Sequence, residues 1–420
     1  MTNSRFFGKS LVLVAGSALS QLLPVMSLPL LSIYYQPASF ASLSVFMALG
    51  AVISIASTGR YELAIVHPKE EKGALDIFFL CCLSSLLISG FIGLTIIGFD
   101  QFGGNQLFET NFSLDFLFLI PFSILGYSLM QVLNYWYTRK GQFVTVSLLR
   151  VSQSILFIGF AFLFGWWGWK SMGLVYAFSF GGGFILAVTL YLLYRKRSFF
   201  SWKDLKTQAA QYRHYPQHLM TTAFMDTAAV QAPIFFLAAS FDPIVVGSYG
   251  FANRIVMAPV TLISASIGQV YYQQIARADR LPSDIIRTFR RTFIVLAILA
   301  ILLFGGLFFL GEYLVGLFFA AEWQEAGSIL SILSLALLIR FVVSPLSLTL
   351  VVLNRFSWVS LWQTTYLVST VTFFLFCPTF GFKKMLYFFV VHESIHYCFY
   401  LLIIYYALKK RTEAGLFKSN

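Results

Sequence analysis

Charged residues are scarce in this sequence of 420 residues. Only 11% are Asp, Glu, Lys or Arg, whereas 58% are hydrophobic and the mean hydropathy is +0.78. Soluble domains carry roughly 25% charged residues, and a surface built from this composition would not stay in water. The scarcity of charge therefore excludes an ordinary water-soluble globular protein.

Cysteine is nearly absent, and the loops on one face of the predicted spans are short. The four cysteines are Cys81, Cys82, Cys377 and Cys398, and each lies within an apolar run, which is typical of small packing residues and excludes a disulfide framework. The loops on the outer face predicted below do not exceed roughly 15 residues. This shortness argues against a membrane enzyme that joins sugars outside the cell, because such chemistry needs room in its loops.

Apolar runs of membrane-spanning length fill the chain instead. A helix needs about 20 apolar residues to cross about 30 Å of hydrocarbon. We predict twelve such spans: Leu11 to Ser32, Phe40 to Ser57, Leu75 to Phe99, Leu114 to Tyr137, Phe143 to Phe164, Met172 to Leu193, His218 to Ser240, Val246 to Val270, Phe293 to Phe319, Gly327 to Val352, Trp358 to Cys377 and Met385 to Ala407. The sequence predicts an all-α integral membrane protein.

Basic residues divide unequally between the two faces of these spans. Of the 29 Lys and Arg residues, 23 fall on one side, 3 on the other and 3 within spans. Cytoplasmic loops carry the excess of Lys and Arg. Arg5 and Lys9 then place the N-terminus inside, and Lys409 to Arg411 place the C-terminus there too. The net charge of +12 would meet anionic lipid headgroups, and dispersal over short loops argues against nucleic acid binding.

The longest polar segment divides the spans into two equal sets. It predicts an N-terminal bundle of six helices at 1–193, a cytoplasmic linker at 194–217 and a C-terminal bundle of six at 218–420. An even number of spans per half would relate the halves as a parallel repeat. We expect the two bundles to surround a central cavity.

Ionisable residues inside spans are the candidate functional groups, because charge in hydrocarbon needs a partner or a water-filled cavity. The basic ones are Arg150, Arg254 and Arg340, with Arg60 at the inner end of the second span. The acidic ones are Asp226 and Glu393, with Glu62 beside Arg60. Four arginines in one cavity would favour an anion. Arg60 and Glu62 could instead lie at the interface, and Arg150 could extend to it along the helix.

A short histidine motif lies in the last span. His392-Glu393-Ser394-Ile395-His396 matches the H-E-x-x-H pattern, in which two histidines on one helical face hold zinc and the glutamate acts as a base. An intramembrane metalloprotease is therefore an alternative. The third ligand that such a site needs is not evident. The histidines could also pack between helices, or His392 could titrate in a transport path.

Several stretches in order resemble one protein family. They are Gly59-Arg60-Tyr61-Glu62, Asn134-Tyr135-Trp136 through Arg150-Val151, Tyr249-Gly250-Phe251-Ala252-Asn253-Arg254 with Pro259, Trp323 with Ala326-Gly327, and Arg340-Phe341 with Ser344-Pro345. Together they resemble the Wzx-type polysaccharide flippases of the multidrug and polysaccharide exporter superfamily.

The resemblance implies a cargo of undecaprenyl pyrophosphate carrying an oligosaccharide, moved to the outer leaflet of the bacterial inner membrane for O-antigen (lipopolysaccharide) or capsule assembly. It implies no enzymatic activity and no cofactor or resident metal, with a polysaccharide polymerase and a chain-length regulator as further partners. We expect Arg254 and Arg340 to bind the pyrophosphate and Arg60 and Arg150 to shape the path. Glu62, Asp226, Glu393 and His392 are candidates for ion coupling. A cation-coupled drug exporter of the same superfamily is the second hypothesis.

Overall fold

The computed structural model describes residues 3–101, 114–170, 172–197, 201–276, 282–376 and 380–416, and these residues form helices without strands. Eleven helical segments in this part are long and apolar enough to cross a membrane. The first predicted span corresponds to α1 and α2, whose described apolar stretch is Ala15–Leu31. The all-α integral membrane fold predicted from the sequence is confirmed; the central cavity stays a prediction.

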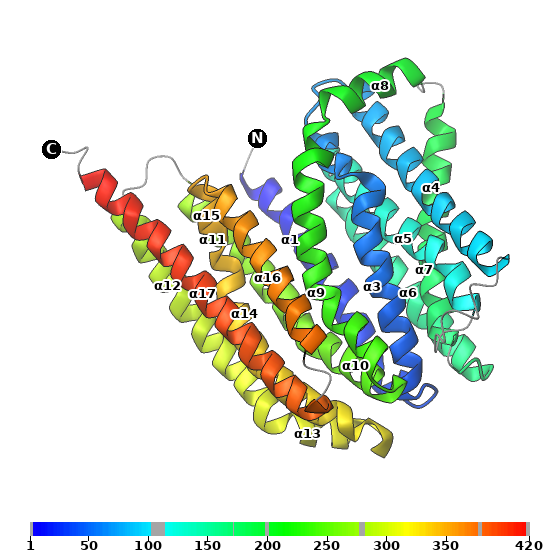
Figure 1. Ribbon diagram of the computed structural model, residues 1–420. Helices are drawn as coiled ribbons and strands as arrows, with labels where there is room; N and C mark the ends of the chain where they lie inside the picture. Colours follow the sequence, from blue (N-terminus) through cyan, green and yellow to red (C-terminus); the bar gives the residue numbers. More distant parts are fainter. Residues whose placement is uncertain are drawn as a thin grey trace. The chain divides into compact units, whose positions relative to one another are not determined.

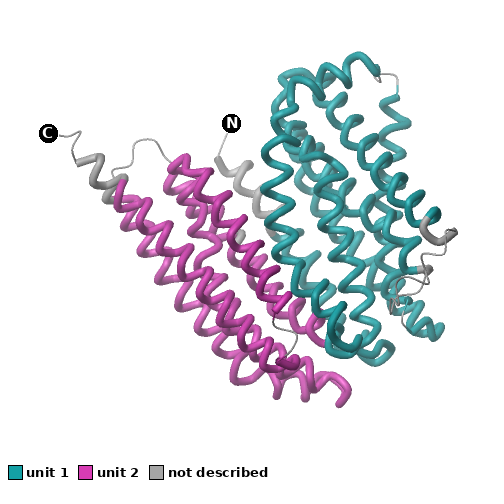
Figure 2. Tube along the Cα trace, viewed as in Figure 1, with its two compact units in different colours: residues 1–247 teal, residues 248–420 magenta. Residues whose placement is uncertain are grey.

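The chain forms two compact units, residues 1–247 and 248–420 (Figures 1 and 2). The first contains α1 (Asn3–Met26), α2 (Leu28–Leu31), α3 (Pro37–Thr58), η1 (Tyr61–Val66), α4 (Glu71–Gln101), α5 (Leu114–Arg139), α6 (Phe143–Trp166), α7 (Gly173–Lys196), α8 (Trp202–Gln211), η4 (Tyr215–Leu219) and α9 (Met220–Ser240). The helix α9, predicted to open the second half, packs on α3 within this unit. The division into two six-helix bundles stays a prediction.

The second unit begins within α10 (Pro243–Pro259). It continues with η5 (Val260–Ser264), α11 (Ala265–Ile275), α12 (Pro282–Ala300), η6 (Ile301–Gly305), α13 (Gly306–Phe318), η7 (Ala321–Trp323), α14 (Gln324–Leu346), α15 (Leu348–Val352), α16 (Phe356–Phe376) and α17 (Phe382–Leu416). The helix α14 is the most buried of the eleven spans and contacts α12, α13 and α17. It forms the core of this unit.

Proline and glycine mark irregular turns inside the long spans. A π-helical turn, η5, follows Pro259, and another, η6, ends at the Gly305-Gly306 pair. Proline cannot donate the backbone hydrogen bond of a regular helix, so the ladder must rearrange around it. Such π-turns occur frequently at functional sites.

Glycine allows α5 and α7 to approach closely in the first unit. A Cβ atom on Gly126 would lie 3.0 Å from the Cα atom of Gly182, whereas one on Gly183 would meet nothing within 4 Å. Small residues at helix contacts are a common device of membrane proteins, because backbone contact replaces the hydrophobic effect there. The Gly181 to Gly183 run therefore contributes a packing contact.

Two basic loops and the linker meet at one end of the first unit. Arg139 donates to the Ile65 carbonyl at 3.1 Å, the Tyr61 hydroxyl donates to the Ala209 carbonyl at 3.1 Å, and Lys72 pairs with Asp204 at 2.7 Å. In Figure 1, α8 lies across this end of the unit. The excess of Lys and Arg predicted that these segments share one face of the membrane, and the fold brings them together.

Candidate functional site

A sharp turn after α3 places the first two candidates side by side. The helix α3 ends at Thr58, and both Gly59 and Arg60 have left-handed backbones, with φ of 56° and 61°. A non-glycine residue in this region is uncommon and carries strain. The turn brings the Arg60 Nη1 atom within 3.4 Å of the Glu62 Oε1 atom.

Glu62 is a buried carboxyl group near the predicted cytoplasmic end of the spans. It is 1% exposed, and within the described part of the chain its Oε2 atom has no hydrogen-bond partner. Burial raises the pKa of Glu62, while the nearby Arg60 charge opposes that rise. The site therefore favours a proton on Glu62 more than water does.

Arg150 joins the same region from α6. Its Nη1 atom donates to the Ser17 hydroxyl of α1, and its Nε atom donates to the Asn134 side-chain oxygen of α5 at 3.4 Å. The Tyr135 ring interacts electrostatically with Glu62, Arg60 and Arg150. Arg150 is therefore held inside the bundle instead of extending to the membrane surface.

These residues form what we call the first-unit cluster: Ser17, Arg60, Glu62, Asn134, Tyr135 and Arg150. They come from α1, the turn after α3, α5 and α6. Asn134 and Tyr135 were part of the family resemblance, but no sequence pattern assigned them a role. Their contacts with Arg150 now supply one.

A second polar cluster is built on α14, α16 and α17. Glu393 is 3% exposed and accepts a hydrogen bond from the Tyr366 hydroxyl. Arg340 attracts the Glu393 carboxylate and lies 5.6 Å from the centre of the Tyr397 ring. Tyr249 interacts electrostatically with both charged groups. A buried carboxylate thus interacts electrostatically with an arginine in a region that also holds three tyrosines.

The two histidines of the last span converge on one serine. The Nε2 atoms of His392 and His396 lie 3.1 and 2.7 Å from the Ser369 hydroxyl of α16, and the ring centres are 4.7 Å apart. Nearby, Trp362 stacks on Tyr366 and on Tyr400. We call the combined set, Tyr249, Arg340, Trp362, Tyr366, Ser369, His392, Glu393, His396, Tyr397 and Tyr400, the second-unit cluster.

This geometry does not resemble a zinc protease site. Both imidazoles turn their Nε2 atoms to a serine hydroxyl, while Glu393 bonds to Tyr366. In the segments that the structure describes, no three His, Cys, Asp or Glu side chains lie close enough to hold a metal ion. A catalytic zinc needs three protein ligands, so these residues do not fit that centre.

The remaining two candidates, Arg254 and Asp226, are not among the residues named in the two clusters. Arg254 is half-buried on α10 in the second unit, and Asp226 is exposed on α9 in the first. Each takes part in an interaction of its own. The structure thus joins Arg60, Glu62 and Arg150 in one cluster and Arg340, Glu393 and His392 in another.

The fold is that of a multi-pass integral membrane protein with paired charges inside it. The chain belongs to the family described as "Polysaccharide biosynthesis protein", whose sequence profile matches residues 35–328. No curated protein matches the chain. The predicted family is therefore confirmed.

Solved structures share the fold over nearly the whole chain. An inward-facing multidrug resistance MATE transporter of the MOP superfamily has 16% identity and a TM-score of 0.69, covering 96% of this chain and all of its own. The lipid II flippase MurJ, inward closed, has 14% identity and a TM-score of 0.67, with coverage of 97% and 91%. The MATE multidrug transporter DinF-BH has 16% identity and a TM-score of 0.65, with coverage of 96% of both chains. None of these three is an enzyme, in agreement with the non-enzymatic prediction.

Proposed function

We propose that this protein is a flippase for undecaprenyl-pyrophosphate-linked oligosaccharide, which it moves from the cytoplasmic to the periplasmic leaflet of the bacterial inner membrane. The observation that carries the proposal is a polysaccharide-biosynthesis family profile on a fold shared with a lipid II flippase. The products would serve O-antigen or capsule assembly. Both termini would be cytoplasmic, and a polymerase and a chain-length regulator would act next.

The chemistry of the cargo suits arginines inside the membrane. A headgroup of sugars and pyrophosphate loses its water in hydrocarbon at several kcal/mol per unpaired polar group. Arg supplies paired donors that match phosphate oxygens. In this proposal Arg254 and Arg340 bind the pyrophosphate, and Arg60 and Arg150 line the path. Each unit supplies part of the charge.

The buried carboxylates would compete with the pyrophosphate of the cargo for the same arginines. Glu393 attracts Arg340, and Glu62 contacts Arg60 at 3.4 Å, so each carboxylate occupies an arginine that the pyrophosphate needs. A proton on the carboxyl group would weaken that attraction and release the guanidinium for the anion. Glu62, Glu393, His392 and Asp226 are therefore our candidates for proton coupling. Outward movement of an anion also gains roughly 2.3 kcal/mol per charge per 100 mV.

A deletion strain tests the proposed roles. We expect Arg340→Ala and Arg254→Ala to abolish surface glycan while the protein still inserts at normal levels. Arg355→Ala is the control, because Arg355 is exposed between α15 and α16 and contacts the Trp358 ring. Normal glycan in the first two variants would remove their proposed role.

A cation-coupled drug exporter is the second candidate, favoured by the fold shared with multidrug MATE transporters. A site for cationic drugs would need more acidic than basic groups. The predicted spans and their inner ends offer Arg60, Arg150, Arg254 and Arg340 against Glu62, Asp226 and Glu393. Glycan loss in the deletion strain without altered drug resistance would decide against the exporter.

A further inference from the structure

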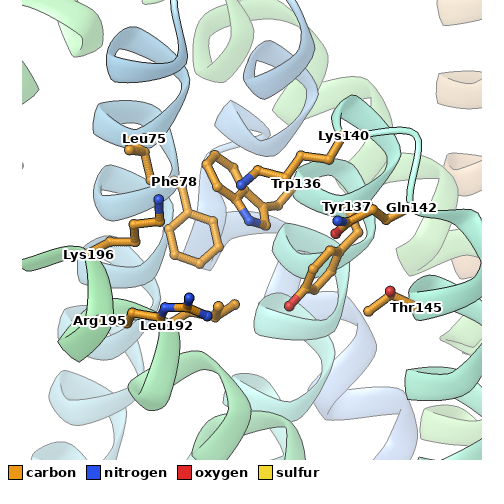
Figure 3. Close-up of a pocket in the computed structure, with 10 residues that line it drawn as sticks. All are labelled: Leu75, Phe78, Trp136, Tyr137, Lys140, Gln142, Thr145, Leu192, Arg195 and Lys196. Atoms are coloured by element: carbon orange, nitrogen blue, oxygen red, sulfur yellow. The ribbon is translucent and has the colours of Figure 1, made fainter.

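A cavity of about 400 Å³ lies at one end of the first unit, apart from both clusters (Figure 3). The beginnings of α4 and α6 and the C-terminal ends of α5 and α7 surround it. Lys140 of α5 and Arg195 and Lys196 of α7 supply its basic side chains. Figure 3 shows these three side chains around a space that Phe78 and Trp136 border.

The basic side chains outnumber the acidic groups at the cavity. Glu71 of α4 is the carboxylate that pairs with them, at 3.2 Å from the Lys140 Nζ atom and 3.7 Å from the Lys196 Nζ atom. The Glu71 side chain is 59% exposed. The lining of the cavity, within the described residues, holds three basic side chains and no acidic one, and solvent weakens the pairs with Glu71. An anion of higher charge would compete well for the same lysines.

The rest of the cavity wall is apolar and aromatic. Leu75 and Phe78 of α4, Trp136 of α5 and Leu192 of α7 form this wall, and Trp136 is only 2% exposed. The Lys140 ammonium lies 4.4 Å from the centre of the Trp136 ring. A small inorganic ion would leave this apolar wall without contacts. A ligand with both an anionic group and apolar atoms would use the whole cavity.

Exposed apolar residues beside the cavity indicate where such a ligand comes from. Val144 and Leu148 on α6 and Tyr191 on α7 are 53%, 60% and 61% exposed, as expected for side chains that face lipid. The cavity itself lies where the apolar spans end, which is where a bilayer of matching thickness would place its headgroups. Basic pockets between transmembrane helices on the cytoplasmic side bind anionic lipid headgroups.

We propose that this cavity binds the phosphate group of an anionic glycerophospholipid from the surrounding leaflet. Lys140, Arg195 and Lys196 would contact the phosphate oxygens, and the wall of Leu75, Phe78 and Leu192 would contact the glycerol and the first acyl carbons. The lipid would join the ends of α5 and α7. The proposal does not depend on the transported cargo.

Thermal unfolding of the full-length protein in a neutral detergent tests the proposal. Phosphatidylglycerol, phosphatidylcholine and inorganic phosphate are added separately at equal concentration. A ligand that binds only the folded state raises the unfolding temperature. We expect a rise of several degrees with phosphatidylglycerol and little change with phosphatidylcholine, whose choline cation the site repels. An equal rise with inorganic phosphate would overturn the lipid assignment.

Matched variants locate the effect. Lys140→Ala with Lys196→Ala should abolish the rise, whereas Lys203→Ala with Lys206→Ala should keep it, because it removes two exposed charges from α8 at the same end. Glu71→Gln removes the competing carboxylate and should lower the phosphatidylglycerol concentration that gives half the rise. This third variant works in the opposite direction, so the test does not depend on a weakened fold. A rise unchanged in the first pair or equally lost in the control pair would overturn the proposal.

Discussion

The Tyr366 hydroxyl on α16 donates a hydrogen bond to the Glu393 carboxylate on α17. The bond joins two spans of the second unit across a nearly solvent-free contact, since Glu393 is 3% and Tyr366 2% exposed. A buried carboxylate needs such donors, because desolvation without partners costs several kcal/mol. The pair holds in place the group that faces Arg340.

Tyr366→Phe should therefore destabilise the protein, by about 1 to 3 kcal/mol, because it leaves a buried acceptor with one donor fewer. The measurement is the apparent unfolding temperature of the purified protein in detergent. Tyr387→Phe on α17 is the matched control, since Tyr387 is 54% exposed. Equal unfolding temperatures for wild type and Tyr366→Phe would show that the bond contributes nothing.

Glu62 should make stability depend on pH in a defined direction. Burial raises the pKa of Glu62, so the folded protein holds this proton more tightly than the unfolded chain. The resulting stabilisation is complete below the unfolded pKa of about 4.3 and is lost as pH rises through the raised folded value. The Glu62→Gln variant has no carboxyl group to lose this proton and keeps its stability as pH rises. The unfolding temperature of the variant relative to wild type should therefore increase with pH.

Asp204 provides a control of opposite sign. Its contact with Lys72 lowers the pKa of Asp204, so its contribution is present above the unfolded pKa and is lost as pH falls through the folded one. The advantage of the wild type over Asp204→Asn should shrink in acid. If both variants track the wild type at every pH, the two carboxyl groups do not act as described.

The contact between α5 and α7 predicts a difference between two glycine variants. Gly126→Ala places a Cβ atom 3.0 Å from the Gly182 backbone, so the helices must shift, at a cost of about 1 to 3 kcal/mol. Gly183→Ala has open space and should change little or gain stability. The fraction of each variant that stays folded after mild heating measures its stability relative to wild type. A Gly126→Ala protein as stable as Gly183→Ala would refute the close approach.

The sidedness of the membrane is directly testable by single cysteines in a background without the four native ones. Lys69 lies in a loop predicted to be cytoplasmic, and Lys384 in one predicted to be periplasmic. A membrane-impermeant maleimide should label Lys384→Cys, not Lys69→Cys, on spheroplasts. Inverted vesicles should give the reverse pattern. The same pattern in both preparations would contradict the orientation.

The spans could be predicted from sequence because hydrocarbon imposes one requirement on every spanning segment. A run such as Leu75 to Phe99 has few other places to lie, and the structure places α4 (Glu71–Gln101) there. The boundary between the units is harder to predict from sequence than the spans are, because α9 is apolar whichever bundle it joins. Its packing on α3 follows from three-dimensional contacts that no local pattern records.

The charged members of the clusters could also be predicted, because charge within a span stands out against its neighbours. Their neutral partners could not. Tyr366 is one of 21 tyrosines, and Ser369 is a common helical residue in membranes. What distinguishes them is their position opposite Glu393 and the two histidines, which depends on how α16 faces α17. Arg254 and Asp226 keep their predicted roles as hypotheses.

Translocation by the purified protein tests the central proposal most directly. The protein is reconstituted in liposomes with undecaprenyl-pyrophosphate-linked oligosaccharide, and the glycan that reaches the opposite leaflet is measured with an impermeant glycosidase. Glycan in the inner leaflet is protected from the external glycosidase until it is moved outward. We expect wild type to make this glycan cleavable rapidly, and Arg340→Ala to leave about as much of it uncleaved as protein-free liposomes do. Equal protection in wild-type and empty liposomes, with or without a proton gradient or membrane potential, would contradict the proposed flippase activity.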